Sequence, residues 1–206
     1  MNASGAIMRE SNPLIRAWSG GDGKPSSCLD DFRVGLLRRL AQEAPAGHFV
    51  EVGVYRGGSA WHLAEIAREQ GRELHLFDTF SGMPWQQDCD IFKIGDFDKT
   101  NVEDVRRWVP DATIHVGIFP ETLPPWLLGI AFAHIDCDQF QSVDACIRYL
   151  WPRMVPGAVM LFDDYPELEG ARRAVERSGL ELCFAPQDSA TPHLHLRGRY
   201  YARKPL

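Results

Sequence analysis

Two patterns of apolar and polar positions recur along the chain and predict its secondary-structure elements. Short runs rich in β-branched and aromatic residues predict strands, whereas apolar residues spaced three or four apart predict helices. The strands are expected at 48–54, 74–77, 113–118, 130–135, 158–162, 180–185 and 193–201, and the helices at 29–40, 60–70, 100–109, 142–150 and 168–178. The third helix begins with Thr100 to Glu103, which matches a capping box. Alternating strands and helices are typical of an α/β fold with a parallel sheet.

The end of the chain departs from this alternation. Its last two predicted strands follow each other with only the loop 186–192 between them. Strands joined in this way pair antiparallel, so we expect a doubly wound, mostly parallel seven-stranded sheet with an antiparallel C-terminal edge hairpin and helices on both faces. Residues 28–206 show no internal boundary and are expected to form one domain. Residues 1–27, rich in Gly, Ser, Asn and Pro, are expected to form a flexible segment or a lid.

Acidic residues follow two neighbouring predicted strands. Asp136 and Asp138 come directly after the fourth strand, and Asp163 and Asp164 come after the fifth. A right-handed helical crossover makes the two strands parallel, so the four acids meet at the sheet edge where α/β proteins bind ligands. Four carboxylates there would repel one another unless a cation or a proton intervened. We therefore expect a site for a hard divalent cation.

Some of these acids have a structural alternative. Asp163 and Asp164 could cap the helix that follows them, and Asp138 could cap the helix at 142–150. Asp138 is therefore left out of the expected metal site. His134 lies on a strand that we expect to be buried, so it is interpreted as a hydrogen-bonded core residue.

Glycines follow the first predicted strand, in the segment 51–59 (EVGVYRGGS). Glycine lets the backbone approach a ligand, and the start of the next helix offers free N–H groups to an anion. The segment is expected to bind a nucleotide-like cofactor, although its spacing differs from the GxGxxG dinucleotide fingerprint. Asp78 lies about 20 residues after Gly58, where such folds place a ribose-binding carboxylate. The loop could instead be an ordinary tight turn, and Asp78 could instead cap a helix or a turn.

Composition narrows the class of partner. The 22 Lys and Arg against 28 Asp and Glu give a net charge of −6, which argues against nucleic acid. Five cysteines without paired spacing suit reduced thiols. No apolar run approaches the roughly 20 residues of a membrane helix, and the start of the chain lacks the order of a signal peptide. We expect a cytoplasmic protein that does not bind membranes and acts on a small molecule.

Several motifs in one order resemble the macrocin O-methyltransferase family. They are FVEVGVYRGGSA, LHLFDTFSGMP, GDFDKTNVEDVRRW, GIFPETLP, HIDCDQFQSVDACIRYLWPRMVPGAVMLFDDY and YYARK. Members of that family depend on S-adenosylmethionine and Mg²⁺ and methylate hydroxyls, often on sugars of natural products. The glycine loop is also similar to that of catechol O-methyltransferases. The resemblance implies a Rossmann-like fold, these two cofactors, a hydroxylated small-molecule substrate such as a sugar or polyol, and, by analogy, a homodimer.

The resemblance also implies roles for individual residues. Asp136, Asp163 and Asp164 would hold the metal, and Asp136 is in addition the candidate general base. The implied cofactor-binding residues are Glu51, Gly53, Tyr55, Gly57, Ser59, Asp78, Thr79, Gly117 and Ile118. The chain departs from the family at two places: Cys137 stands where glycine is common, and residues 1–27 are shorter than the usual helical extension. The second departure bears on substrate choice and oligomer contacts.

Three other functions fit part of the pattern. Asp136 and Asp138 form a DxD motif, as in metal-dependent glycosyltransferases, but this function explains neither the glycine loop nor the second acidic pair. An NAD-dependent oxidoreductase would use the glycine loop and leave the acids without a role. A non-catalytic nucleotide-binding module is favoured by the short N-terminal segment. The aromatic loop 80–99 either covers a bound molecule or forms a small packed cluster.

Overall fold

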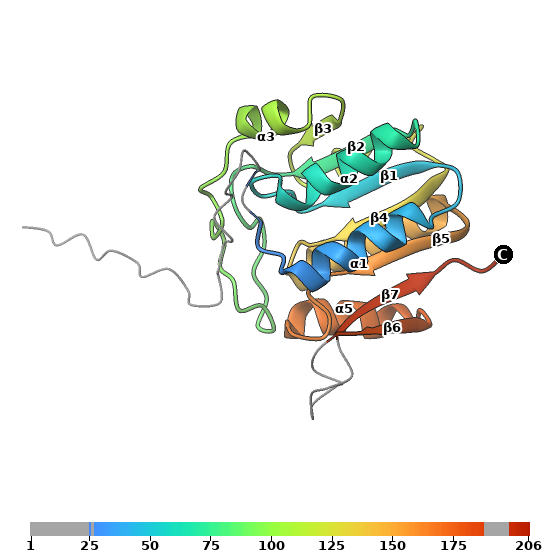
Figure 1. Cartoon of the computed structure of the whole chain (residues 1–206). Coiled ribbons are helices and arrows are strands. Elements are labelled where there is room, and N and C mark those ends of the chain that lie inside the picture. The colour runs from blue at the N-terminus through green and yellow to red at the C-terminus, as the bar shows by residue number, and fades with distance from the viewer. Residues whose placement is uncertain (1–24, 26, 188–197) are drawn as a thin grey trace, which may run out of the picture.

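The computed structural model describes residues 25, 27–187 and 198–206 and shows a sheet between two layers of helices (Figure 1). The strands are β1 (His48–Val52), β2 (Leu74–Asp78), β3 (Thr113–Val116), β4 (Ile130–Ile135), β5 (Met154–Phe162), β6 (Leu182–Pro186) and β7 (Gly198–Arg203). The helices are α1 (Asp31–Gln42), α2 (Gly58–Glu69), α3 (Val102–Trp108), α4 (Phe140–Leu150) and α5 (Glu169–Ser178). Each predicted element therefore has a counterpart among the described residues, and the largest described shift is that of β5, which begins at Met154 instead of residue 158.

The strand order is β3-β2-β1-β4-β5-β7-β6. Strands β1 to β5 are parallel to one another, and β7 runs antiparallel to both β5 and β6. The arrow of β7 accordingly points the opposite way to those of β1 and β4 (Figure 1). The mostly parallel seven-stranded sheet and the antiparallel hairpin are confirmed. The hairpin does not simply extend the edge, however, because β7 lies between β5 and β6.

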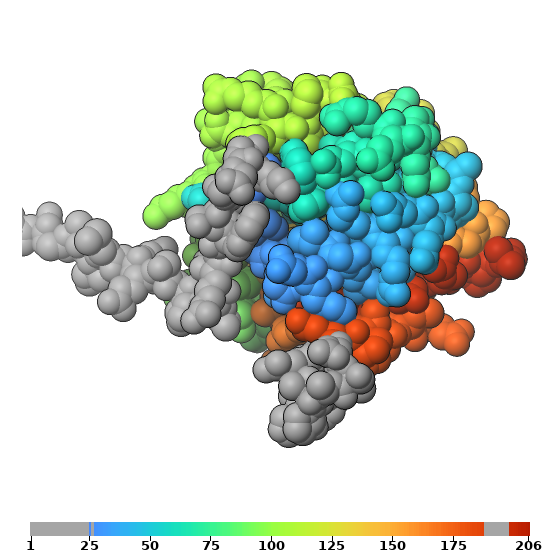
Figure 2. Space-filling model, viewed as in Figure 1, coloured from blue at the N-terminus to red at the C-terminus, as the bar shows by residue number. Residues whose placement is uncertain are grey.

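Helices cover both faces of the sheet because its strands are apolar on both faces. α1 and α2 lie side by side over the near face (Figures 1 and 2). Beneath them Leu37 and Leu63 are fully buried together with the strand residues Phe49 and Phe132. Each such side chain contributes roughly 1.5–3 kcal/mol through its burial. The other face packs on α4 and α5, and all six residues of β4 are buried, as two-sided burial requires.

The start of α3 differs from the predicted capping box. Asn101 is the N-cap residue, and its side-chain oxygen accepts a hydrogen bond from the Glu103 N–H at 2.8 Å. The hydroxyl of Thr100 instead donates to the carbonyl oxygen of Tyr55. The expected cap therefore fails because a tertiary contact engages the threonine, which ties the start of α3 to the glycine loop.

Some predictions fall on residues that the structure leaves undescribed. The expected lid at 1–27 lies outside the described residues except for Pro25 and Ser27, and so do the first five residues of the last predicted strand. Within the described ranges, no helix has both the length and the apolar character that crossing a membrane requires.

Candidate active site

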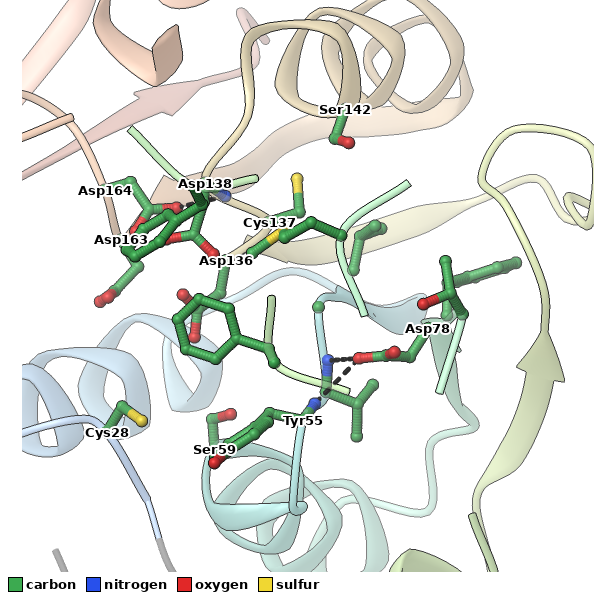
Figure 3. Close-up of a pocket in the computed structure, with 18 of the residues that line it drawn as sticks. Cys28, Tyr55, Ser59, Asp78, Asp136, Cys137, Asp138, Ser142, Asp163 and Asp164 are labelled. Atoms are coloured by element: carbon green, nitrogen blue, oxygen red, sulfur yellow. Dashed lines mark hydrogen bonds between the residues drawn. The ribbon is translucent and has the colours of Figure 1, made fainter. Parts of the chain in front are cut away.

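The C-terminal ends of four parallel strands meet at a cavity of about 410 Å³. Gly53 follows β1, Asp78 ends β2, Asp136 follows β4 and Asp163 follows β5, and all four line the cavity. The acids of β4 and β5 gather on one side, Asp78 lies on the other, and the glycine loop passes between them (Figure 3). The crossover argument thus correctly places these strand ends at one edge of the sheet.

Glycine is required where the loop leaves β1. Gly53 has φ +91°, and a Cβ there would collide with the carbonyl oxygen of Asp136. The ends of β1 and β4 can therefore approach each other only without a side chain at this position. Gly57, with φ +86°, is the N-cap of α2 and provides no side-chain cap, so the start of α2 keeps its N–H groups open to an anion.

Asp78 holds the glycine loop against the end of β2. Its Oδ2 accepts hydrogen bonds from the N–H groups of Val54 at 2.7 Å and Tyr55 at 2.9 Å, and its Oδ1 accepts one from Phe80 at 2.7 Å (Figure 3 shows the first two). Asp78 is therefore a turn cap, as one alternative held. Because each carboxylate oxygen can accept more than one hydrogen bond, it also keeps acceptor capacity toward the cavity.

The residues implied to bind the cofactor separate into two groups. Those that line the cavity are Gly53, Tyr55, Ser59, Asp78, Thr79 and Gly117. Those that do not are Glu51, Gly57 and Ile118. Glu51 is fully buried within β1, and Gly57 faces the side chain of Val105. In place of Ile118, the next residue, Phe119, lines the cavity.

Glu51 pairs with His134 beneath the cavity floor. Its Oε1 lies 2.8 Å from Nδ1 of His134, and both side chains are completely buried. Burial alone would lower the pKa of His134, but the hydrogen bond and charge of Glu51, together with nearby carboxylates, raise it to about 9. The pair thus links β1 to β4 through a buried hydrogen bond, which agrees with the interpretation of His134 as a hydrogen-bonded core residue.

Three carboxylates form a compact group at the acidic side of the cavity. Asp136, Asp163 and Asp164 each offer one oxygen, and these atoms lie within 4.8 Å of one another. Asp138 contributes its backbone to this arrangement, since its N–H donates to Oδ2 of Asp164 at 2.9 Å. Asp138 adopts φ +58°, a left-handed conformation that directs its N–H at its neighbour.

The electrostatics of this group call for positive charge. Burial raises the pKa of Asp136, and the charges of Asp163 and Asp164 raise it further. Burial and Asp163 likewise raise the pKa of Asp164 to about 7, although the hydrogen bond from Asp138 opposes the shift. Carboxylate oxygens are the ligands that Mg²⁺ prefers, so the donor set fits such an ion chemically.

Two arginines lie at the site that the sequence pattern did not predict there. Arg33 at the start of α1 donates from Nη1 to Oδ2 of Asp163 at 2.7 Å. Arg199 of β7 places Nε 3.8 Å from Oδ1 of Asp163 and donates from Nη1 to Glu167 at 2.6 Å. Nothing in the local pattern indicates where α1 points or which strands β7 joins. The sequence alone therefore could not indicate that Arg33 and Arg199 contact Asp163.

The aromatic loop 80–99 forms the small packed cluster that one alternative predicted, and it also lines the cavity. The ring of Phe97 lies 5.0 Å from that of Phe92 and 5.6 Å from that of Tyr55, which makes a packed cluster, and all three residues line the cavity. Asp90 fixes the loop to α4, because its Oδ1 accepts a hydrogen bond from the N–H of Phe140 at 2.9 Å. The loop therefore forms one wall of the cavity, and aromatic rings packed against one another stabilise it.

Comparisons of sequence identify relatives of the chain. Residues 26–179 match the family model described as Macrocin-O-methyltransferase (TylF). A curated relative from Streptomyces olivaceus, 8-demethyl-8-(2,3-dimethoxy-α-L-rhamnosyl)-tetracenomycin-C 4′-O-methyltransferase, is 28% identical over 173 residues. The match covers 71% of this chain but only 63% of the relative, so the chain spans less than two thirds of that protein's length.

Comparisons of structure agree on the fold. The O-methyltransferase NovP superposes with a TM-score of 0.73 at 21% identity, covering 87% of this chain and 82% of that one. The O-methyltransferase TomG from Streptomyces achromogenes, in complex with SAM, has a TM-score of 0.53 at 16% identity, covering 85% and 81%. These likenesses show a Rossmann-like methyltransferase fold. Because the family model spans most of the sequence, the chain belongs to the macrocin O-methyltransferase family.

Proposed function

We propose that this protein is an O-methyltransferase that uses S-adenosylmethionine and Mg²⁺ to methylate a hydroxyl of a small molecule, a sugar or polyol of a secondary metabolite. Residues 28–206 would act as one methyltransferase domain. Family membership supports this proposal, as does the name of the Streptomyces olivaceus relative, which describes 4′-O-methylation of a rhamnosyl tetracenomycin. The observation that carries it is the cavity with a glycine loop on one side and three carboxylates on the other.

The cofactor would lie along the glycine loop. Asp78 has free acceptor capacity for ribose hydroxyls, and the open start of α2 suits the carboxylate of the methionine part. When bound, S-adenosylmethionine supplies the electrophilic methyl group. TomG, which shares the fold, was solved in complex with SAM, and this supports the choice of cofactor.

The metal would be held by Asp136, Asp163 and Asp164. When bound, Mg²⁺ stabilises negative charge on a substrate oxygen and orients the hydroxyl. Hydrogen bonds within the chain orient two of these carboxylates before a metal binds. Arg33 fixes one oxygen of Asp163, and the N–H of Asp138 fixes one oxygen of Asp164.

Asp136 is the proposed general base. It lies at the end of β4 against the glycine loop, so it is the cluster member closest along the sheet to the cofactor side. In this role its carboxylate accepts the proton of the attacking hydroxyl, as a base must lie within hydrogen-bond reach of the proton it removes. The aromatic loop 80–99 limits the access of water to that proton transfer.

Replacing Asp136→Asn tests the proposal. Loss of a general base and metal ligand should lower methyl transfer by at least about 10²-fold, while calorimetry should show S-adenosylhomocysteine affinity changed by less than about threefold. Transfer from labelled S-adenosylmethionine to a panel of rhamnosylated natural products measures activity, with and without a chelator. Unchanged turnover in this variant would refute the role of Asp136.

The neighbouring substitution Asp138→Asn serves as the matched control. Asparagine tolerates the left-handed conformation at this position and leaves the backbone hydrogen bond to Asp164 in place. Methyl transfer should therefore be largely retained. An equal loss in both variants, together with binding of a nucleotide sugar, would favour the DxD glycosyltransferase. Tight binding of NAD alone would favour an oxidoreductase.

A further inference from the structure

A second group of metal-ligating side chains lies at the opposite edge of the sheet. His48 begins β1, and Glu73 and His75 flank the start of β2, whereas the proposed active site occupies the other ends of these strands. His75 pairs in register with Val50, two positions after His48, so both histidines project from the same face. One ligand atom from each of the three residues lies within 4.8 Å of the others. The proposed methyl transfer uses none of them.

The spacing of these atoms fits a tetrahedral metal ion. Nδ1 of His48 lies 3.2 Å from Oε2 of Glu73, and Nε2 of His75 lies 3.4 Å from the same oxygen. Ligands bound to Zn²⁺ at about 2.0–2.1 Å in tetrahedral geometry are separated by about 3.3–3.4 Å. Both measured distances between ligand atoms are therefore close to those of a tetrahedral zinc site.

The ring of His75 is arranged as that of a metal ligand. Its Nε2 is buried and has no hydrogen-bond partner among the described residues, although it faces Glu73. Its other nitrogen, Nδ1, lies 3.2 Å from Nε2 of His115 on β3. A ligating histidine commonly uses its second ring nitrogen in a hydrogen bond that fixes the tautomer.

We propose that His48, Glu73 and His75 bind one zinc-class divalent ion, with a fourth position open to solvent beside the exposed Glu73. Two imidazoles and one carboxylate favour Zn²⁺ over Mg²⁺, which prefers oxygen ligands alone. The ion ties the start of β1 to the start of β2, away from the reacting groups. Its role is to stabilise the folded chain, because a metal that binds the native state raises its stability.

Zinc titration of the metal-stripped full-length chain tests the site. Glu73→Gln and His48→Ala should each weaken Zn²⁺ affinity at least tenfold in calorimetry and remove the rise in melting temperature that Zn²⁺ causes. Glu181→Gln removes the same charge from an exposed position elsewhere and should bind Zn²⁺ like the wild type. Equal Mg²⁺ should not displace the ion.

A crystal grown with Zn²⁺ gives the decisive view. An anomalous peak is expected at about 2.0–2.2 Å from the three ligand atoms. The proposal is overturned if Glu73→Gln and His48→Ala bind Zn²⁺ as tightly as the wild type, or if the peak lies only at cysteines or at the acidic cluster. Since these residues lie outside the cavity, S-adenosylhomocysteine affinity should not change in either variant, and failure of this site leaves the proposed methyl transfer standing.

Discussion

At the scale of single residues, Asp78 shows how one side chain can serve both fold and ligand. Three backbone N–H groups donate to its two oxygens, and together they fix the glycine loop at the end of β2. The same carboxylate also borders the cavity. The turn-cap and ribose-binding interpretations of Asp78 are therefore compatible, and an experiment must measure both roles.

Replacing Asp78→Ala should affect stability and binding together. Removing the acceptor leaves three N–H groups without it, which costs about 1–3 kcal/mol of unfolding free energy in urea titrations. S-adenosylhomocysteine affinity should fall at least tenfold in calorimetry. Asp78→Asn keeps one carbonyl acceptor and should lie between the two proteins. Lower stability with unchanged S-adenosylhomocysteine affinity would show that Asp78 acts only as a turn cap.

The acids and the arginines differ in how far the sequence could place them. Asp136, Asp163 and Asp164 follow recognisable strands, and parallel strands bring their ends together, so their meeting follows from topology. Arg33 and Arg199 reach Asp163 through the direction of a helix and the order of strands. Neither property is encoded in a local pattern of apolar residues, so these contacts required the structure.

At the scale of elements, the pair Glu51 and His134 joins the two central strands. The residues are directly opposite in the β1–β4 register, and no water-accessible surface surrounds them. Oε2 of Glu51 and Nε2 of His134 make no hydrogen bond in the described structure. The pair is therefore sensitive to the loss of either member.

A double-mutant cycle should reveal this dependence. Glu51→Leu leaves the buried ring of His134 without its hydrogen-bond partner and should cost about 3–5 kcal/mol in urea unfolding. Glu51→Leu combined with His134→Leu replaces both polar side chains by apolar groups and should cost less than the sum of Glu51→Leu and His134→Leu measured singly. Additive costs would show that the two side chains do not interact energetically.

Element positions were predictable where periodicity is strong. The buried run of β4 and the amphipathic α5 appear within a residue or two of their expected bounds. The exception at the start of α3 arises because Thr100 bonds to Tyr55, a contact between residues far apart in the sequence. Local signals place an element, whereas a tertiary contact can decide the residue at which it begins.

At the scale of the whole molecule, the two ends of the parallel strands have different chemistry. The carboxyl ends carry the cavity and its acids, and the opposite edge carries His48, Glu73 and His75. On the C-terminal side of the sheet, β7 lies between β5 and the edge strand β6, an order that no sequence pattern indicated. Homodimerisation, expected by analogy with the family, stays a prediction.

Deleting residues 198–206 should abolish the native fold. Among the described strands β6 pairs only with β7, and β5 would lose a neighbour along Val159 to Phe162. The deletion also removes Arg199 from Asp163. Circular dichroism should show loss of cooperative melting, and gel filtration should show aggregation through the exposed strand edge. Deleting only residues 205–206 is the control, since Leu206 is fully exposed, and an equal melting temperature in both deletions would contradict this prediction.

The place of β7 also governs the order in which the sheet is assembled. β6 precedes β7 in the chain, so it leaves the ribosome before its partner exists. β5 has the same open edge at that moment, but β6 cannot occupy it in the native arrangement, because β7 must first enter between them. β6 therefore reaches its native place in the sheet only through β7, which is synthesised after it.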